Sequence, residues 1–254
     1  MEGVSELIYV TGDCHGDFQN FSTKRFPEQK ELTKEDYVII CGDFGGVWNY
    51  EEESNSEKYW LDWLNDKPFT TLFIDGNHEN FDRLYSYPES DWNGGKVHNI
   101  RSSVFHLMRG EIFTINDKRI YAFGGAASHD IQDGILDMSE EDKIYSYRKT
   151  GRYFRIRNFS WWDRELPTKD EMQNGLKNLE KVNYNVDYVI SHCAPTSIQI
   201  LLDSRFKSDI LTNYHQNVQN KLKFKKWFFG HYHMDKAVTA EFVCVYNDII
   251  SLIW

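Results

Sequence analysis

Residues 7–17 read LIYVTGDCHGD, an apolar and β-branched run that passes directly into a polar loop. The run at 7–11 has the pattern of a buried strand, and the loop after it begins at Gly12 and carries Asp13 and His15. Residues two apart in an extended chain point to the same side, so these two side chains can bind a cation from one direction. The stretch therefore predicts a strand with metal-binding side chains at its C-terminal end.

Four further stretches repeat this arrangement. Strand-like runs at 37–41, 70–74, 186–190 and 226–229 each end at a loop that contains glycine or proline and a side chain able to bind a metal ion. These loops supply, in chain order, Asp43, Asn77 with His78, His192, and His231 with His233. Ligands of open α/β sheets bind at the carboxyl ends of the strands, so we expect all five loops to meet at one crevice.

The spacing of these runs predicts an α/β core. Residues 53–64 and 169–182 have helical spacing and lie between strand-like runs, which gives the order strand, loop, helix, strand. A second group of strands is more closely spaced: 104–107, 112–115 and 119–123, the last two joined by a turn at 116–117, and the stretch 237–254, with its turn at 247–248. A mixed sheet or a second antiparallel sheet is expected beside the core.

The stretch at about 130–167 is rich in charged and aromatic residues and lacks a clean strand pattern. We expect one domain over 1–254, with this stretch inserted as a cap over one face of the core. Its Trp161 and Trp162 are candidates for substrate binding, as an aromatic wall that stacks a base or excludes water. The alternative is that the two tryptophans anchor the insertion to the core.

Composition limits the partners of the chain. Its 29 Lys and Arg against 39 Asp and Glu give a net charge of −10, the opposite of the basic surface that tracks a polyanion. Some of these carboxylates can be metal ligands, but the balance favours a small or locally captured substrate over long duplex nucleic acid. No apolar run approaches the ~18 residues of a membrane span, and residues 1–3 do not begin a signal-like segment. We expect a soluble, cytoplasmic protein without a membrane partner.

The residue types indicate which metal ions fit. A mixed set of Asp, Asn and His side chains suits Mn, Fe, Zn, Co or Ni better than Ca or Mg. The four cysteines lack the spacing of a zinc site or a disulfide framework, and we interpret them as reduced thiols. A single histidine is more often structural, but five motifs in order indicate a shared site. His129, soon after two glycines, is a further candidate to reach this site, the alternative being a surface or core position.

In order along the chain, the motifs GDCHG, GDFG, GNHE, the strand end at His192 and GHYH resemble those of the calcineurin-like metallophosphoesterase superfamily, over Gly12 to His233. This resemblance implies a four-layer α/β/β/α sandwich of two mixed sheets flanked by helices, with two divalent metal ions, manganese favoured, at the sheet edge. It implies two sets of ligands: Asp13, His15 and His233 for the first ion, and Asn77, His192 and His231 for the second. Asp43 would bridge both ions, and His78 would face the leaving group.

The activity implied is that of a dinuclear phosphoesterase in which a hydroxide bridging the two ions attacks the phosphorus atom. Phosphodiesters are favoured, and the substrate is expected to be a small phosphoester or a nucleotide. A phosphomonoesterase or nucleotide phosphatase of the same fold is the alternative, and a metal-binding scaffold that serves as an interaction protein is the non-enzyme alternative. The second motif lacks the arginine of the GDxxDRG motif of serine/threonine protein phosphatases, which disfavours that branch.

Side chains of four kinds are expected to contact the substrate. Asn77 and His78 lie beside the ions, and the two tryptophans of the insertion form the aromatic wall described above. Arg83, six residues after Asn77, is a candidate phosphate contact because a guanidinium binds phosphate oxygens in a bidentate manner. The alternative for Arg83 is an ion pair on the helix that begins in this run.

Overall fold

The computed structural model of the chain describes residues 6–252. Residues 1–3 and the last two residues of the stretch 237–254, which enter the sequence predictions, lie outside the described residues. None of the helices between residues 6 and 252 combines the length and the apolar character needed to cross a membrane.

The first sheet has seven strands in the order β15-β1-β2-β3-β6-β5-β4. Strands β1, β2, β3 and β6 are parallel, and β15, β5 and β4 are antiparallel to their neighbours. β2 and β3 are buried at every position, which is why their sequences are continuous apolar or β-branched runs. The strands are β1 Ile8–Thr11, β2 Tyr37–Ile40, β3 Thr70–Phe73, β4 Glu89–Trp92, β5 Gly95–Arg101, β6 Val104–Leu107 and β15 Ile250–Ser251.

The second sheet has six strands in the order β13-β14-β12-β11-β8-β7. Its four central strands are parallel, and the edge strands β13 and β7 are antiparallel to their neighbours. The strands are β7 Glu111–Ile115, β8 Lys118–Phe123, β11 Tyr188–Ser191, β12 Lys226–Phe229, β13 Lys236–Ala237 and β14 Phe242–Cys244. Both sheets are therefore mixed, as the sequence predicts.

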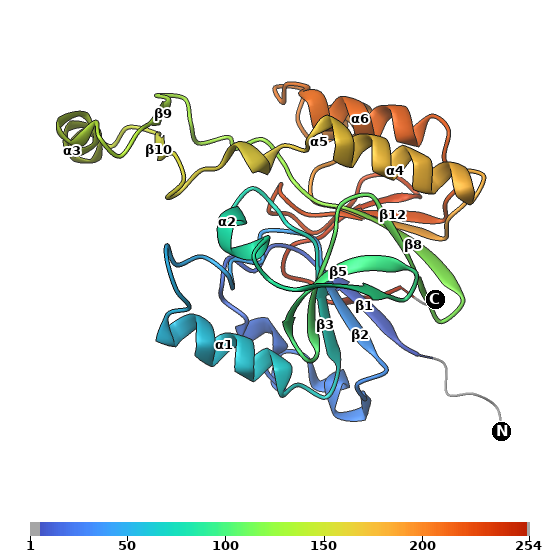
Figure 1. Cartoon of the computed structure of the whole chain (residues 1–254). Coiled ribbons are helices and arrows are strands. Elements are labelled where there is room, and N and C mark those ends of the chain that lie inside the picture. The colour runs from blue at the N-terminus through green and yellow to red at the C-terminus, as the bar shows by residue number, and fades with distance from the viewer. Residues whose placement is uncertain (1–5, 253–254) are drawn as a thin grey trace.

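Helices cover the outer faces of both sheets. Figure 1 shows α1 outside the first sheet and α4, α5 and α6 outside the second, which makes four layers. α1 and α4 both begin with a capping box, formed by Ser54 with Glu57 and by Thr168 with Glu171. The helices are α1 Asn55–Asn65, α2 Phe81–Leu84, α3 Glu141–Thr150, α4 Lys169–Lys181, α5 Thr196–Leu202 and α6 Ile210–Gln219, with 3-10 turns at Gln19–Phe21, Pro27–Glu31 and Asp163–Glu165.

The main core lies between the two sheets. It packs Ile39 and Leu72 of the first sheet against Ile120, Ile190 and Phe228 of the second, and all five are buried. Burying a side chain of this size contributes roughly 1.5–3 kcal/mol, so this shared layer fixes the two sheets face to face. The predicted α/β fold is confirmed, and the strands and helices expected from spacing agree with the observed ones to within two residues at each end.

One predicted hairpin is wrong. The sequence suggests that 237–254 folds back on itself through a turn at Asn247 and Asp248, but β14 pairs with β12 of the second sheet and β15 pairs with β1 of the first. Where the chain crosses between the sheets, the Asp235 carboxylate accepts the backbone N–H groups of Tyr246 (2.7 Å), Asn247 (3.1 Å) and Asp248 (3.2 Å). These bonds satisfy the turn without a hairpin partner.

A hairpin that the sequence prediction omits joins β4 to β5. Asn93 and Gly94 connect the two strands, with φ of 47° and 93°. Positive φ at both central residues is the requirement of a tight hairpin turn, and Asn-Gly is the strongest short sequence signal for it. The signal was therefore present in the sequence.

The segment at 130–167 has local structure of its own. It contains α3, a two-stranded sheet of β9 (Ile135–Leu136) with β10 (Arg155–Ile156), and a small core of Leu136, Ile144 and Ile156. Figure 1 shows α3, β9 and β10 projecting from the body of the molecule. That this segment is a cap over the site stays a prediction.

Candidate metal centre

Five loops from both sheets supply the predicted ligands. They follow the C-terminal ends of β1, β2 and β3 in the first sheet and of β11 and β12 in the second. Four of the ligands have a positive φ, which non-glycine residues adopt rarely: His15 (48°), Asp43 (45°), His231 (69°) and His233 (49°). Such backbone strain is typical of functional sites, because the surrounding fold must hold each residue in place.

The first ligand set forms a compact group. One ligand atom from each of Asp13, His15, Asp43 and His233 lies within 4.8 Å of all the others. The Nε2 atom of His233 is 3.0 Å from both the Oδ2 atom of Asp13 and the Nε2 atom of His15. Asp13 and Asp43 are buried, whereas the two histidines are exposed, so the group opens to solvent on its imidazole side.

The second ligand set is centred on His192, which is fully buried. Its Nδ1 lies 2.7 Å from the Cys41 carbonyl, which can only accept, so Nδ1 carries a proton and donates it. In a neutral ring Nε2 is then unprotonated, and it faces the Oδ1 atoms of Asn77 and of Asp43, each at 3.3 Å. Three acceptors that converge in this way need a positive charge between them, and a divalent cation fits this requirement.

Electrostatics around His192 show the same demand for positive charge, which a second ring proton meets when no cation is bound. Burial lowers its pKa, but the Asp43 and Asp13 carboxylates more than reverse this effect and raise the pKa to about 9. Burial in turn raises the pKa of Asp43, but the imidazoles of His192, His78 and His15 hold it well below its usual range. The Asp43 carboxylate therefore stays ionised and attracts cations to this edge of the sheets.

Asp43 faces both ligand sets. Its Oδ2 lies 3.7 Å from the Nε2 of His15, and its Oδ1 lies 3.3 Å from the Nε2 of His192 and accepts the backbone N–H of His78 at 2.8 Å. The Asp43 carboxylate packs so closely against residue 76 that glycine is required there, because a Cβ would lie 2.0 Å from the Asp43 Oδ1 atom. The carboxylate is thus placed between the two predicted sites.

The Asp43 loop is held by Glu79, which the sequence prediction did not single out although it ends the GNHE motif. Its buried carboxylate accepts the backbone N–H groups of Phe44 at 2.7 Å and Gly45 at 3.3 Å. Burial and the neighbouring Asp43 carboxylate raise the pKa of Glu79 well above its usual value. Glu79 therefore fixes the backbone on which Asp43 sits.

His78 lies next to the ligands but outside both sets. Its ring centroid is 5.3 Å from that of His15 and 6.4 Å from that of Trp48. These three residues and Gly45 line a cavity of about 210 Å³ beside the metal ligands. Burial lowers the pKa of His78, despite the opposing effect of Asp43. Trp48, five residues after Asp43, was missed by the sequence prediction.

The predicted substrate contacts of the insertion are buried. Trp161 and Trp162 expose only 9% and 3% of their surface, and neither lines the cavity beside His78. The Trp162 Nε1–H donates to the Asp82 carboxylate at 2.8 Å, and its ring packs edge-on against Trp48 at 6.0 Å. The guanidinium of Arg157 lies 5.0 Å from the Trp161 ring centroid. The contacts of Trp162 match the anchoring alternative, whereas the contact of Trp161 with Arg157 lies within the insertion itself.

Arg83 is directed to another partner. Its Nη1 donates to the Glu57 carboxylate at 2.8 Å and to the Asn49 carbonyl at 2.9 Å, and both charged side chains are largely buried. This geometry matches the ion-pair alternative. We therefore leave Arg83 out of the substrate site.

His129 does reach the site. Its Nε2 lies 2.6 Å from the Nε2 of His231, and the two rings are stacked with centroids 4.5 Å apart. The ring of Phe206 lies 5.4 Å away. His129 is thus brought to the second ligand set although it lies outside every metal motif.

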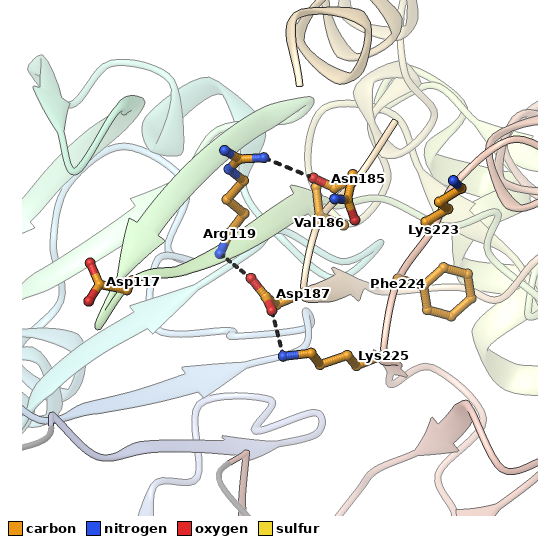
Figure 2. Close-up of a pocket in the computed structure, with 8 residues that line it drawn as sticks. All are labelled: Asp117, Arg119, Asn185, Val186, Asp187, Lys223, Phe224 and Lys225. Carbon is orange, nitrogen blue, oxygen red and sulfur yellow. Dashed lines mark hydrogen bonds and ion pairs between the residues drawn. The ribbon is translucent and has the colours of Figure 1, made fainter. Parts of the chain in front are cut away.

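A separate pocket of about 330 Å³ lies at the opposite ends of the strands, before β11 and β12 begin. Figure 2 shows Asp187 between Arg119 and Lys225, and the Arg119 guanidinium directed to Asn185. Asp187 accepts the backbone N–H of Arg119 at 3.0 Å and contacts the Lys225 ammonium at 2.8 Å. It contains no predicted site residue, so the chemistry suggested by the motifs is located at the metal ligands.

Comparison with known proteins adds a family and several relatives. A model of the family described as calcineurin-like phosphoesterase matches residues 7–235. The chain is 29% identical over 144 residues to Lariat debranching enzyme A of Xenopus laevis, covering 51% of this chain and 26% of that protein. It is 21% identical over 260 residues to Lariat debranching enzyme of Homo sapiens, covering 92% of this chain and 43% of that protein. It is 25% identical over 205 residues to Lariat debranching enzyme of Caenorhabditis elegans, covering 75% of this chain and 37% of that protein. The chain spans less than half the length of these relatives.

Proposed function

Because the chain belongs to the calcineurin-like phosphoesterase family, and is therefore a metal-dependent hydrolase of phosphoric esters, we propose that it cleaves phosphodiesters at a pair of divalent metal ions. Manganese is the ion we favour, since carboxylate, amide and imidazole ligands suit first-row ions of this kind. The four cysteines are unpaired thiols, which accords with the reducing cytoplasm as the location.

The position of Asp43 carries the proposal. One carboxylate oxygen faces His15 of the first ligand set, and the other faces His192 of the second. A carboxylate placed in this way can bind one ion with each oxygen. Asp13, His15 and His233 would complete the first site, and Asn77, His192 and His231 the second. When bound, such a pair of ions supplies Lewis acidity and lowers the pKa of the attacking water.

The protein residues then position and protonate the reacting groups. His78 faces the cavity beside the ligands, where it can donate a proton to the leaving oxygen or bind a non-bridging phosphoryl oxygen. Its backbone N–H is tied to Asp43, so its place relative to the ions is fixed. Trp48 forms an apolar wall of the same cavity and limits access of water to the leaving group.

A diester is favoured over a monoester for two reasons. Three of the relatives are named for debranching lariats, a reaction that opens a linkage within a larger molecule. In addition, the described cavity is lined by one tryptophan, one glycine and two histidines, and the arginine that acts on the pKa of His78, Arg155, is already paired with the Asp130 carboxylate. The net charge of −10 favours a nucleotide or a short captured strand over long duplex nucleic acid.

The test compares bis-p-nitrophenyl phosphate with p-nitrophenyl phosphate on metal-stripped protein resupplied separately with Mn, Ni, Zn, Co and Mg. We expect faster turnover of the diester, with Mn among the most active ions. A preference for the monoester would indicate a phosphatase of small molecules instead. Full metal uptake without cleavage of either ester would favour a metal-binding scaffold and would overturn the proposal.

A further inference from the structure

Two consecutive residues, Ser128 and His129, each contact a different member of the second ligand set. Ser128 contacts Asn77, and His129 contacts His231. They follow β8 at the start of the projecting segment, and neither belongs to a metal motif. Both contacts are made to the second ligand set, which suggests that these two residues position ligands of the second metal site and not of the first.

The contact of Ser128 fixes the amide of Asn77. The Ser128 Oγ–H donates to the Glu165 carboxylate at 2.5 Å, so the hydroxyl oxygen is free to accept from the Asn77 Nδ2–H at 3.4 Å. The same Glu165 carboxylate accepts the Ser128 backbone N–H at 3.1 Å. With its NH2 group engaged, Asn77 turns its Oδ1 toward His192, which is the orientation a metal ligand needs.

Glu165 is unusual for a carboxylate in that only 3% of its surface is exposed. It lies in the 3-10 turn at the end of the projecting segment, 37 residues after Ser128. Its backbone neighbour, the Arg164 carbonyl, accepts a hydrogen bond from Arg109 at 2.8 Å, which holds the turn against the core. Burying a carboxylate costs free energy, so we expect Glu165 to have a bonding role at this position, and its two hydrogen bonds from Ser128 provide one.

The contact of His129 is better explained by a hydrogen bond than by a shared ion. Two nitrogens 2.6 Å apart, each ~2.05 Å from one metal ion, would subtend an angle of roughly 80°, tighter than octahedral or tetrahedral coordination. A hydrogen bond between the two Nε2 atoms leaves Nδ1 of His231 for the metal. A ring that binds metal through Nδ1 carries its proton on Nε2, so His231 donates and His129 accepts.

The first ligand set has no comparable support from this segment. The His15 and His233 rings contact each other and the aspartates of their own set, and Tyr246 stacks on His233 with centroids 4.7 Å apart. The two sites therefore differ in what holds their ligands. Among residues 6–252 the first set is held by the loops of the sheets, whereas the second also contacts Ser128 and His129.

We infer that Ser128, His129 and Glu165 are positioning residues for the second metal ion, and that they set the affinity of this site independently of the first. The inference rests on the proposed function, since it takes Asn77, His192 and His231 as ligands. It predicts that substituting residues that bind neither ion will weaken metal binding at the second site and leave metal binding at the first unchanged.

The experiment measures Mn²⁺ binding to the metal-free protein by calorimetry and by electron paramagnetic resonance. Wild type is expected to bind two ions and to give the spectrum of a coupled pair. Ser128→Ala, His129→Ala and Glu165→Gln should each weaken the second site by about 10- to 100-fold and leave the first unchanged. The spectrum at limiting Mn²⁺ should then be that of an isolated ion. Ser128→Thr, which keeps the hydroxyl, should restore the pair.

Controls come from the same segment. Ser146→Ala and Tyr145→Ala change exposed positions on α3 and should bind both ions as wild type does. Equal weakening of both sites, or unchanged binding in Ser128→Ala and His129→Ala, would overturn the inference. Should one of the three variants Ser128→Ala, His129→Ala and Glu165→Gln fold poorly, the other two decide the same question. A wild type that binds fewer than two ions contradicts the proposed function itself, which is a different result.

Discussion

The two sheets contribute different chemistry to the same centre. The loops of the first sheet carry all the oxygen ligands, Asp13, Asp43 and Asn77, together with His15, whereas the loops of the second carry only imidazoles, His192, His231 and His233. Each proposed metal site draws on both sheets. Neither sheet supplies all the proposed ligands of a site, so the comparison teaches that bound metal ions would also link the two halves of the sandwich.

The strongest test of this comparison removes the residue shared by both sites. Asp43→Asn removes the charged oxygens proposed to be shared by both ions and leaves the second ion without any carboxylate ligand, so we expect hydrolysis to fall by ~10³-fold or more, equivalent to about 4 kcal/mol of transition-state stabilisation. Steady-state turnover and metal content report the effect. Asp91→Asn, at an exposed position of β4, is the matched control. Two tightly bound ions in Asp43→Asn would contradict the bridging position.

His78 sharpens the comparison because it comes from the first sheet but lies outside both ligand sets. His78→Ala should lower turnover by ~10² to 10³-fold on a diester with an alkyl leaving group, since such an oxygen needs a proton. The loss should be much smaller with p-nitrophenolate, which leaves without protonation. Equal losses on both substrates would assign His78 to phosphoryl binding instead of proton donation.

Metal binding should stabilise the contact between the sheets. An ion at 100 times its dissociation constant adds about 2.7 kcal/mol to the free energy of unfolding. Thermal denaturation with and without Mn²⁺ should show a rise in Tm of several degrees in wild type. His192→Ala removes a ligand of the second sheet and should lose most of the increase from the second ion. If Mn²⁺ raised the Tm of this variant as much as that of wild type, the metal ions would not link the second sheet to the first.

Two buried histidines outside the site, one in each half of the molecule, differ in their hydrogen-bond partners. His98 of the first sheet has a partner, the Nδ1 of His106 at 2.9 Å, whereas both ring nitrogens of His215, on α6 over the second sheet, lack a hydrogen-bond partner among the described residues. Burial lowers the pKa of His215 to about 3. Burial, with a smaller effect of His106, lowers that of His98 to about 4.

For His215 the unfolded state, with a pKa of ~6.5, binds more protons than the folded state between pH 6.5 and 3. The free energy of unfolding should therefore fall as the pH falls through this range, by up to ~1.4 kcal/mol per pH unit for this residue. His215→Leu should make the slope measured by urea denaturation shallower by that amount. An unchanged slope would mean that His215 is not buried in its neutral form.

Arg83 should give the smallest effect on catalysis. Because its guanidinium is bound to Glu57 and lies outside the described cavity, Arg83→Ala should leave KM for the diester unchanged. The loss of an ion pair should instead lower Tm. A rise in KM without a change in Tm would restore the phosphate-contact hypothesis.

Much of the centre could be predicted from the sequence. Apolar runs that end in Gly-Asp, Gly-Asn-His or Gly-His turns are local patterns, and they place the ligands at strand ends whatever the later packing does. The family membership, the mixed α/β fold and the hydrolase class follow from them, and the comparisons confirm these three. Glu79 and the Asn93-Gly94 turn were also readable, since each lies in a motif or a dipeptide of known preference.

Other features depend on contacts between distant residues and have no local pattern. The sequence by itself determined which side chains end the strands, because strand periodicity and turn preferences act over a few residues. Only the tertiary structure decided that β14 and β15 join different sheets, that Arg83 pairs with Glu57, and that Glu165 reaches back to Ser128. Those choices are made by packing and by burial of charge, which depend on the whole chain at once.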